Sequence, residues 1–257
     1  VINTEDVVKY LPSVQVRKRY IGDRNSIIAT RTSGQTSSAR SLVYADGVLL
    51  SNLLGNRYDF PPRWNMVSAD EISRVDMVYG PFAAEFPGNS VGSVVLLNTR
   101  APDKFEAHVK AQAFREDFSL YNSQQHYDGN KLEASLGGRA GALAWQLDAS
   151  HLDSHGHPMS FAANPSRYTG SAAATAVSGA LRDTDPYGAS RLLLGATSVD
   201  HTTQDSARAK LTWDITPTLR ASYQLGYWQN RSDSTVDSYL RNAAGEAVYS
   251  GIVSIDG

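Results

Sequence analysis

Half of the chain's histidines fall within seven residues, in the segment His151-Leu152-Asp153-Ser154-His155-Gly156-His157. Imidazole and carboxylate groups are ligands that zinc and copper both accept. Asp153, His155 and His157 are therefore candidate metal ligands. The alternative is a polar loop that holds no ion, because the spacing does not match an established tetrahedral site.

Other residue types that could perform catalysis do not form a recognisable pattern. The sequence contains no Ser/His/Asp constellation, and no glycine-rich phosphate loop follows a strand and opens a helix. Asp76 and Glu85 are scattered acids whose spacing does not indicate a glycosidase pair. We therefore expect a protein that is not an enzyme and that carries no resident cofactor, although a metal chelate remains a possible cargo.

Composition excludes several further classes. The 257 residues carry a formal net charge of -2, which gives no basic face for a nucleic-acid partner. The absence of cysteine excludes a disulfide framework and a cysteine-ligated metal. No apolar run reaches the roughly 18 residues of a membrane-spanning helix. Membrane strands are not excluded, because alternating strands give weak hydropathy signals.

From residue 101 onward, apolar and polar residues alternate with period two, which predicts strands with one apolar and one polar face. The alternating segments are 105–113, 131–136, 143–150, 207–215 and 219–227. Short connections at 140–142 and 216–218 alternate with long ones at about 115–130 and 152–206. Short turns at one end and long loops at the other are typical of an outer-membrane barrel. A soluble β-sandwich is the alternative, because alternation is common to both folds.

The first hundred residues contain two local signals and one long motif. Asp46-Gly47, between apolar residues, predicts a tight hairpin turn. Ser68-Ala69-Asp70-Glu71 is a capping box, which predicts a short helix before a strand at 74–79. The run from Tyr79 to Thr99 opens with a Gly-Pro step, continues as a small glycine-spaced loop, and ends in an apolar strand closed by Asn and Thr.

Together these elements resemble the plug domain of TonB-dependent outer-membrane transporters. Tyr79 stands where the family usually has arginine, and Arg31-Thr32 where it has Arg-Gly, which indicates a divergent branch. The resemblance implies an α+β plug domain at residues 1–101. It also implies that residues 102–257 are antiparallel transmembrane β-barrel strands with long extracellular loops, the first part of a barrel of about 22 strands.

The resemblance also implies where a substrate would bind. The family raises three apical plug loops toward the outside, and charged or aromatic residues in them suit an anionic, partly aromatic ligand. The corresponding positions here are Arg19, Tyr20, Gln35, Thr36, Asn56, Arg57 and Tyr58. Solvated loop charge is the alternative for each. The histidine segment would lie at the outer mouth.

The polar strand faces are expected to point into the lumen and to pair with plug cations. These faces carry Glu106, Lys110, Glu133, Asp148, Lys210 and Asp214, and the plug cations include Arg17, Arg31, Arg40 and Arg74. Arg31 and Arg74 are the candidates for plug–barrel locking contacts, with a structural surface role as the alternative.

As a family member, the protein would import a scarce nutrient across the outer membrane of a Gram-negative bacterium, most simply a ferric siderophore. Zinc, copper, cobalamin or a sugar is the alternative cargo. Its implied partners are TonB, through a segment before Val1, a small-molecule metal chelate and outer-membrane lipid, but no nucleic acid. A soluble secreted adhesion or sugar-binding module, and a polysaccharide-processing enzyme, are the alternatives from other classes.

Overall fold

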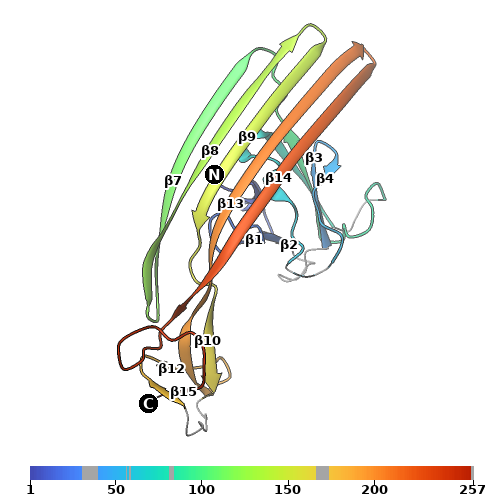
Figure 1. Ribbon diagram of the computed structural model, residues 1–257. Coiled ribbons are helices and arrows are strands. Elements are labelled where there is room, and N and C mark those ends of the chain that lie inside the picture. The colour runs from blue at the N-terminus through green and yellow to red at the C-terminus, as the bar shows by residue number, and fades with distance from the viewer. Residues whose placement is uncertain (31–39, 56, 58, 81–83, 166–173, 256–257) are drawn as a thin grey trace. The chain divides into compact units, whose positions relative to one another are not determined.

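The computed structural model describes residues 1–257 except 31–39, 56, 58, 81–83, 166–173 and 256–257 (Figure 1). The predicted sites at Arg31, Gln35, Thr36, Asn56 and Tyr58 therefore lie outside the described residues. Packing divides the chain into two compact units. The first comprises Val1–Phe114, Gly129–Ser154 and Thr202–Arg231, and the second comprises Arg115–Asp128, His155–His201 and Ser232–Gly257.

Residues 1–101, called the plug segment below, form a mixed sheet with short 3-10 helices. Its elements are η1 (Thr4–Val8), β1 (Val14–Arg17), β2 (Ile27–Thr30), β3 (Ser41–Ala45), β4 (Val48–Leu49), η3 (Trp64–Met66), η4 (Ala69–Glu71), β5 (Ile72–Tyr79) and β6 (Ser93–Thr99). The main sheet has the order β4-β3-β6-β5, with β3 parallel to β6 and the other pairs antiparallel.

The predicted turn at Asp46-Gly47 is confirmed, and it joins β3 to β4. Both residues have positive φ angles, 45° for Asp46 and 84° for Gly47, as a tight hairpin turn requires. The β3 strand is central and buried, so Val43 and its partner Val95 on β6 are both fully inaccessible to solvent. Trp64 closes this core, and its indole Nε1 donates to the Ser26 carbonyl oxygen at 2.9 Å.

After residue 101 the chain is made of long strands and short connections. Its strands are β7 (Glu106–Leu120), β8 (Ser123–Ala140), β9 (Leu143–His155), β10 (Ser160–Pro165), β11 (Thr175–Val177), β12 (Leu181–Thr184), β13 (Ser190–Thr216), β14 (Leu219–Ser238) and β15 (Val253–Ile255). The long strands form one sheet in which β9 lies between β8 and β13, and β14 pairs with β13 (Figure 1).

The short connections near 140–142 and 216–218 are confirmed, but the predicted long loop at 115–130 is wrong. Both β7 and β8 continue into this region, and only Tyr121 and Asn122 separate them. The predicted strands ended where the alternating pattern of apolar residues ended. The backbone pairing continues because polar residues keep the extended conformation when neighbouring strands supply hydrogen bonds.

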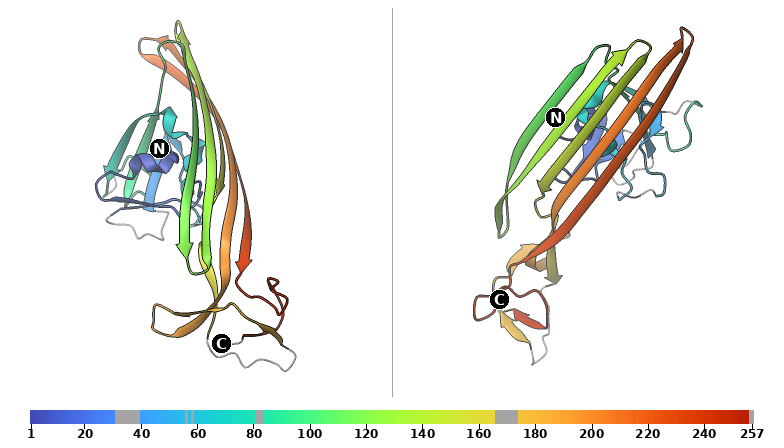
Figure 2. Two further views of the ribbon diagram at one scale, coloured as in Figure 1. Left: turned by 90° about the vertical axis from the view of Figure 1, so that its left-hand side faces the viewer. Right: turned by 45° about the horizontal axis from the view of Figure 1, so that its top comes forward.

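Alternation along the strands separates two faces in the first unit. On β8, Lys131 and Glu133 are buried, whereas Leu132 and Leu136 are exposed. The plug segment lies against one face of the long strands, as the side view shows (Figure 2). Lys131 and Glu133 are on that face, because they contact Ile2 and Ser68 of the plug segment. The expected charged face toward the plug segment is therefore confirmed for these strands. None of the helices that the structure describes is long and apolar enough to cross a membrane.

The second unit contains the remaining short strands. β10 and β12 each pair antiparallel with β13, and β11 pairs parallel with β15. An isolated bridge joins Ser178 to Arg241. The predicted loop at 152–206 thus contains much of this unit's strand structure. The plug segment and parts of the long strands pack together in the first unit. The domain bounds 1–101 and 102–257 stay a prediction.

Candidate functional site: the seam between the plug segment and the strands

Arg208 is the centre of the contact surface between the plug segment and the strands, which we call the seam. Its side chain is 8% exposed. One guanidinium nitrogen, Nη1, donates to Glu71 Oε2 at 2.9 Å, and the other, Nη2, donates to Asp46 Oδ2 at 2.5 Å. Nη2 also donates to Gln224 Oε1 at 2.7 Å. One strand residue thus links two separate parts of the plug segment to β14.

Asp46 reaches Arg208 because the β3–β4 turn presents its carboxylate to the strands. Lys210 Nζ donates to Asp46 Oδ2 at 2.9 Å, and Thr99 donates to the same carboxylate through its backbone N–H and its hydroxyl. Burial opposes ionisation, but hydrogen bonds from Thr99, Lys210 and Arg208 outweigh it and lower the pKa of Asp46 to about 2. Asp46 is therefore a fixed negative charge in the seam.

Glu71 closes the predicted capping box and contacts the strand at the same time. Its Oε1 accepts from the Ser68 backbone N–H at 2.8 Å, while Oε2 faces Arg208. The Ser68 hydroxyl donates in turn to Glu133 on β8 at 2.5 Å. Burial, followed by the negative charge of Asp148, raises the pKa of Glu71 to about 7, although Ser68 and Arg208 act in the opposite direction.

Lysines on β7 and β8 add further contacts to the seam. Lys110 Nζ lies 2.9 Å from Asp70 Oδ1 and 3.5 Å from Glu133 Oε2. Lys131 Nζ lies 2.7 Å from Glu133 Oε1 and donates to the Ile2 carbonyl oxygen at the same distance. The seam thus includes β7 and β8 as well as β13.

The seam has the opposite polarity to the predicted locking contacts. The prediction placed the cations on the plug segment, whereas the contacts above place carboxylates there and cations on the strands. Arg74 instead pairs with Asp76 within β5 at 2.9 Å, and its side chain is 70% exposed. Sequence reasoning missed Arg208. Its position between alanines in an alternating strand was the available signal, but its partners were not visible from the sequence.

The first predicted substrate loop is largely occupied by internal contacts. Arg19 pairs with Asp23 at 2.7 Å, and its guanidinium lies 5.5 Å from the centre of the Tyr20 ring. Tyr20 is only 4% exposed, and its hydroxyl lies 3.3 Å from the Thr202 hydroxyl on β13. Gln204 on the same strand donates to the Gly22 carbonyl oxygen. In this state, Tyr20 packs the loop against the strands and has little surface for a ligand.

The third predicted loop keeps an accessible cation. The Arg57 side chain is 73% exposed and lies 3.7 Å from Asp59. An exposed guanidinium is a group that can bind an anionic ligand. Among the described members of the predicted substrate set, Arg57 is thus more accessible than Tyr20.

Of the predicted metal ligands, His155 and His157 contact different side chains. In the second unit, the imidazole of His155 stacks on that of His201, with ring centres 4.1 Å apart. His157 instead stacks on Phe118 at 4.7 Å, and its Nδ1 lies 3.1 Å from Glu116. Asp153 belongs to the first unit. His201 was missed by the sequence reasoning because it lies far along the chain and only strand pairing brings it beside His155.

Aromatic side chains gather around His157 in the second unit. Phe118 meets Tyr127 edge to face at 6.2 Å, and Tyr121 meets Phe161 in the same way at 4.8 Å. The second unit also holds an apolar cavity of about 320 Å³. Among the residues that line it are Ala162, Ala196, Val236, Leu240 and Tyr249. The unit therefore offers aromatic and apolar surface on a loop-rich scaffold.

Comparisons with known proteins agree with this architecture. Residues 1–94 match the family model of the TonB-dependent receptor plug domain. A variant of the ferric enterobactin receptor PfeA from Pseudomonas aeruginosa, in complex with enterobactin, shares 17% identity and a TM-score of 0.58, over 90% of this chain and 31% of that one. The siderophore receptor PirA from Acinetobacter baumannii shares 16% identity and a TM-score of 0.59, over 90% and 30%.

A copper transporter is also similar in structure. OprC shares 12% identity and a TM-score of 0.52, over 91% of this chain and 28% of its own. Among curated proteins, none matches the sequence significantly. The chain thus spans about a third of the length of the receptors that it resembles.

Two parts of the chain support these comparisons: the plug segment and the strands against which it packs. Residues 1–94 match the plug domain of TonB-dependent receptors, and the following antiparallel strands have the fold of the N-terminal portion of the receptor barrel. The model that residues 1–94 match is that of a receptor plug domain.

Proposed function

We propose that the chain is the N-terminal portion of an outer-membrane receptor that imports a ferric siderophore by a TonB-dependent mechanism. The observation that carries this proposal is a plug domain seated on antiparallel strands through a charged seam. TonB is the proposed partner, because the plug family is defined by dependence on it. Cargo binding at the outer face would precede rearrangement of the plug segment.

The outer membrane is the proposed location because the strand face away from the plug segment is apolar. Leu147, Leu211 and Leu225 are large exposed side chains on β9, β13 and β14. Trp145 and Trp213 lie near the short turns, where aromatic residues of a membrane interface are expected. Lipid would cover this surface.

The proposed cargo is an anionic chelate with aromatic groups. Arg57 on the plug segment supplies an exposed cation, and Tyr58, its neighbour in the sequence, is the predicted aromatic partner. Charge-assisted hydrogen bonds and ring stacking are the interactions that such a chelate offers. Ferric catecholates combine both chemistries. The predicted residues Gln35, Thr36, Asn56 and Tyr58 remain candidates for the same surface.

Uptake of radioactive iron tests the proposal in cells that carry the full-length receptor. A deletion strain should lose uptake of a ferric catecholate, and iron starvation should raise the receptor's abundance in outer-membrane fractions. Arg57→Ala should weaken cargo binding by roughly tenfold, as loss of one charge-assisted contact predicts. Arg24→Ala, another plug-segment arginine, is the control. Unchanged uptake after deletion would contradict the siderophore assignment.

Copper or zinc is the second candidate cargo, favoured by one observation. His155 and His201 bring two imidazoles together, and imidazole binds both metals well. The likeness to OprC concerns fold alone, but a copper transporter is built on it. Calorimetry with copper and zinc salts should lose a binding event in His201→Ala and keep it in His126→Ala. Equal binding by the two variants would remove this candidate.

A further inference from the structure

The plug segment contributes the cation Arg63, whose guanidinium lies 5.5 Å from the centre of the Trp228 ring on β14. Around Glu71, however, the cations come from the strands, and the central charges are buried. The cations are Lys110, Lys131, Arg208 and Lys210, and the carboxylates are Asp46, Asp70, Glu71, Glu133 and Asp148. Buried charges are expensive, so a buried carboxylate that lies near a second buried carboxylate favours uptake of a proton.

Glu71 is the carboxylate best placed to hold that proton. It is 3% exposed and lies between Arg208 on β13 and Asp148 on β9. Asp148 is also buried and accepts a hydrogen bond from Gln146 at 3.0 Å. Asp46 cannot take this role, because Thr99, Lys210 and Arg208 all donate to its carboxylate.

A small cavity beside Glu71 provides space for proton exchange. Its volume is about 20 Å³, which is enough for a single water molecule. Its polar lining comes from the plug segment and from β7, β8 and β9: Ser68, Asp70, Glu71, His108, Lys110, Glu133, Ser135 and Asp148. Arg208 and Lys210 from β13, and Asp46 from the β3–β4 turn, are further charged groups of this part of the seam.

We propose that Arg208 is a positioning residue that holds the plug segment against the strands, in what we call the seated state, through Asp46 and Glu71. In this state Glu71 carries one exchangeable proton. The role of this contact in import rests on the proposed function. When the plug segment leaves the strands, Glu71 enters water and releases the proton. Displacement of the plug segment is therefore coupled to proton release at a defined side chain.

The direction of the pH effect follows from the two pKa values of Glu71. The value is about 7 in the seated state and 4.5 for the free side chain. Between these values the seated form holds more protons than the displaced form, so seating is strongest at low pH and weakens as pH rises toward 7. One proton changes the seating equilibrium by at most about tenfold per pH unit.

Pulse-labelling hydrogen exchange on the full-length receptor in detergent tests this coupling. The protein is equilibrated in urea at several pH values between 5 and 8.5 and then labelled briefly at one common pD. Deuterium uptake by peptides from 41–49 and 68–79 gives the fraction of displaced plug segment. Wild-type protein should require less urea for displacement as pH rises toward 7, and the dependence should level off above it.

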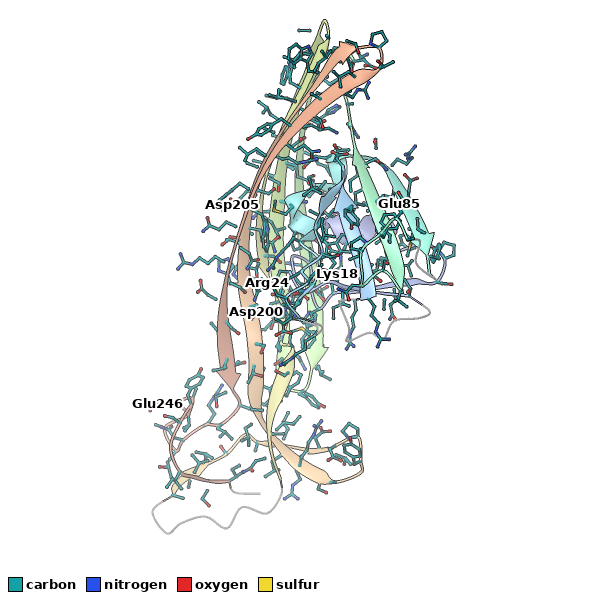
Figure 3. All side chains as sticks on the ribbon, turned by 90° about the vertical axis from the view of Figure 1, so that its right-hand side faces the viewer. Lys18, Arg24, Glu85, Asp200, Asp205 and Glu246 are labelled. Carbon is teal, nitrogen blue, oxygen red and sulfur yellow. The ribbon has the colours of Figure 1, made fainter. Side chains whose placement is uncertain are left out.

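Three variants and one control distinguish loss of the proton-binding group from loss of the fold. Glu71→Gln keeps the hydrogen-bonding shape and should abolish the pH dependence. Arg208→Gln should move the pH transition upward, because it removes a cation that favours ionised Glu71, whereas Arg208→Lys should leave it nearer the wild-type position. Glu85→Gln changes an exposed acid elsewhere on the plug segment (Figure 3) and should behave as wild type.

A flat wild-type profile would overturn the proposal, and so would an unchanged pH dependence in Glu71→Gln. The readout needs neither cargo nor an energy source. Failure of this experiment is therefore distinguishable from failure of the iron-uptake assay, which tests the proposed function.

Discussion

The two faces of strand β13 have opposite chemistry although they share one backbone. Arg208 and Lys210 face the plug segment and bind its carboxylates. Leu211 and Trp213 are large exposed apolar side chains, and Asp205 lies on the side of the sheet opposite to the plug segment (Figure 3). The period of two places these classes on opposite sides of the sheet.

This difference shows how one sheet can face a movable part and a permanent apolar environment. Charged pairs in the seam can be exchanged for water when the plug segment leaves, since each ion recovers its hydration. Apolar side chains on the other face gain nothing from water and favour continued burial. The seam is suited to reversible contact, and the apolar face to lasting contact with lipid.

The largest expected effect comes from removing the central cation of the seam. Arg208→Ala leaves the buried carboxylates of Asp46 and Glu71 without this partner, which should destabilise the seated plug segment by about 3–5 kcal/mol. Urea titration of the full-length receptor at pH 8, followed by exchange of plug peptides, measures the change. Arg220→Ala is the control, because Arg220 pairs with Asp214 at the exposed end of β14. Equal losses in both variants would show that Arg208 has no special role.

A charge on the apolar face should have the next largest effect. Leu211→Arg should destabilise the inserted strands by about 2–4 kcal/mol, because arginine must then face hydrocarbon. The fraction that folds into lipid vesicles, measured by its shifted mobility on unheated gels, reports the loss. Ser222→Arg on β14 is the control. Ser222 lies two residues before the plug-facing Gln224 and therefore on the same side of the strand, so this variant should insert normally. Normal insertion of Leu211→Arg would contradict the assignment of this face to lipid.

The capping box should contribute an intermediate amount. Ser68→Ala removes the acceptor for Asp70 N–H and the donor to Glu133, so the plug segment should lose about 1–2 kcal/mol. The same urea titration measures this loss. Ser73→Ala, which alters an exposed serine on β5, is the matched control. A larger loss in Ser73→Ala would place the important contact on β5 instead of the seam.

The smallest expected effect comes from Arg74, the residue predicted to hold the plug segment to the strands. Arg74→Ala breaks an exposed pair with Asp76 and should cost about 0.5 kcal/mol or less. A loss comparable to that of Arg208→Ala would restore Arg74 as a locking residue. Comparing the two variants in one titration series therefore tests whether the cations that hold the plug segment lie on the strands or on the plug segment.

Local features of this fold could be predicted because neighbouring residues control them. The Asp46-Gly47 turn needs positive φ angles, and the Ser68–Glu71 box needs its two side chains three residues apart. The alternating faces of the long strands follow equally from the geometry of an extended chain. The strand ends near residue 120 were missed, because backbone pairing continued beyond the apolar pattern.

The sequence by itself determined which strand positions carry charge and which carry apolar side chains. Only the tertiary structure decided the partners: Arg208 lies 137 residues from Glu71 and 162 from Asp46 in the chain, and Tyr20 lies 182 from Thr202. Many charged residues could have supplied these contacts. The choice among them depends on how the plug segment docks, which is a property of the whole packed surface and not of any local pattern.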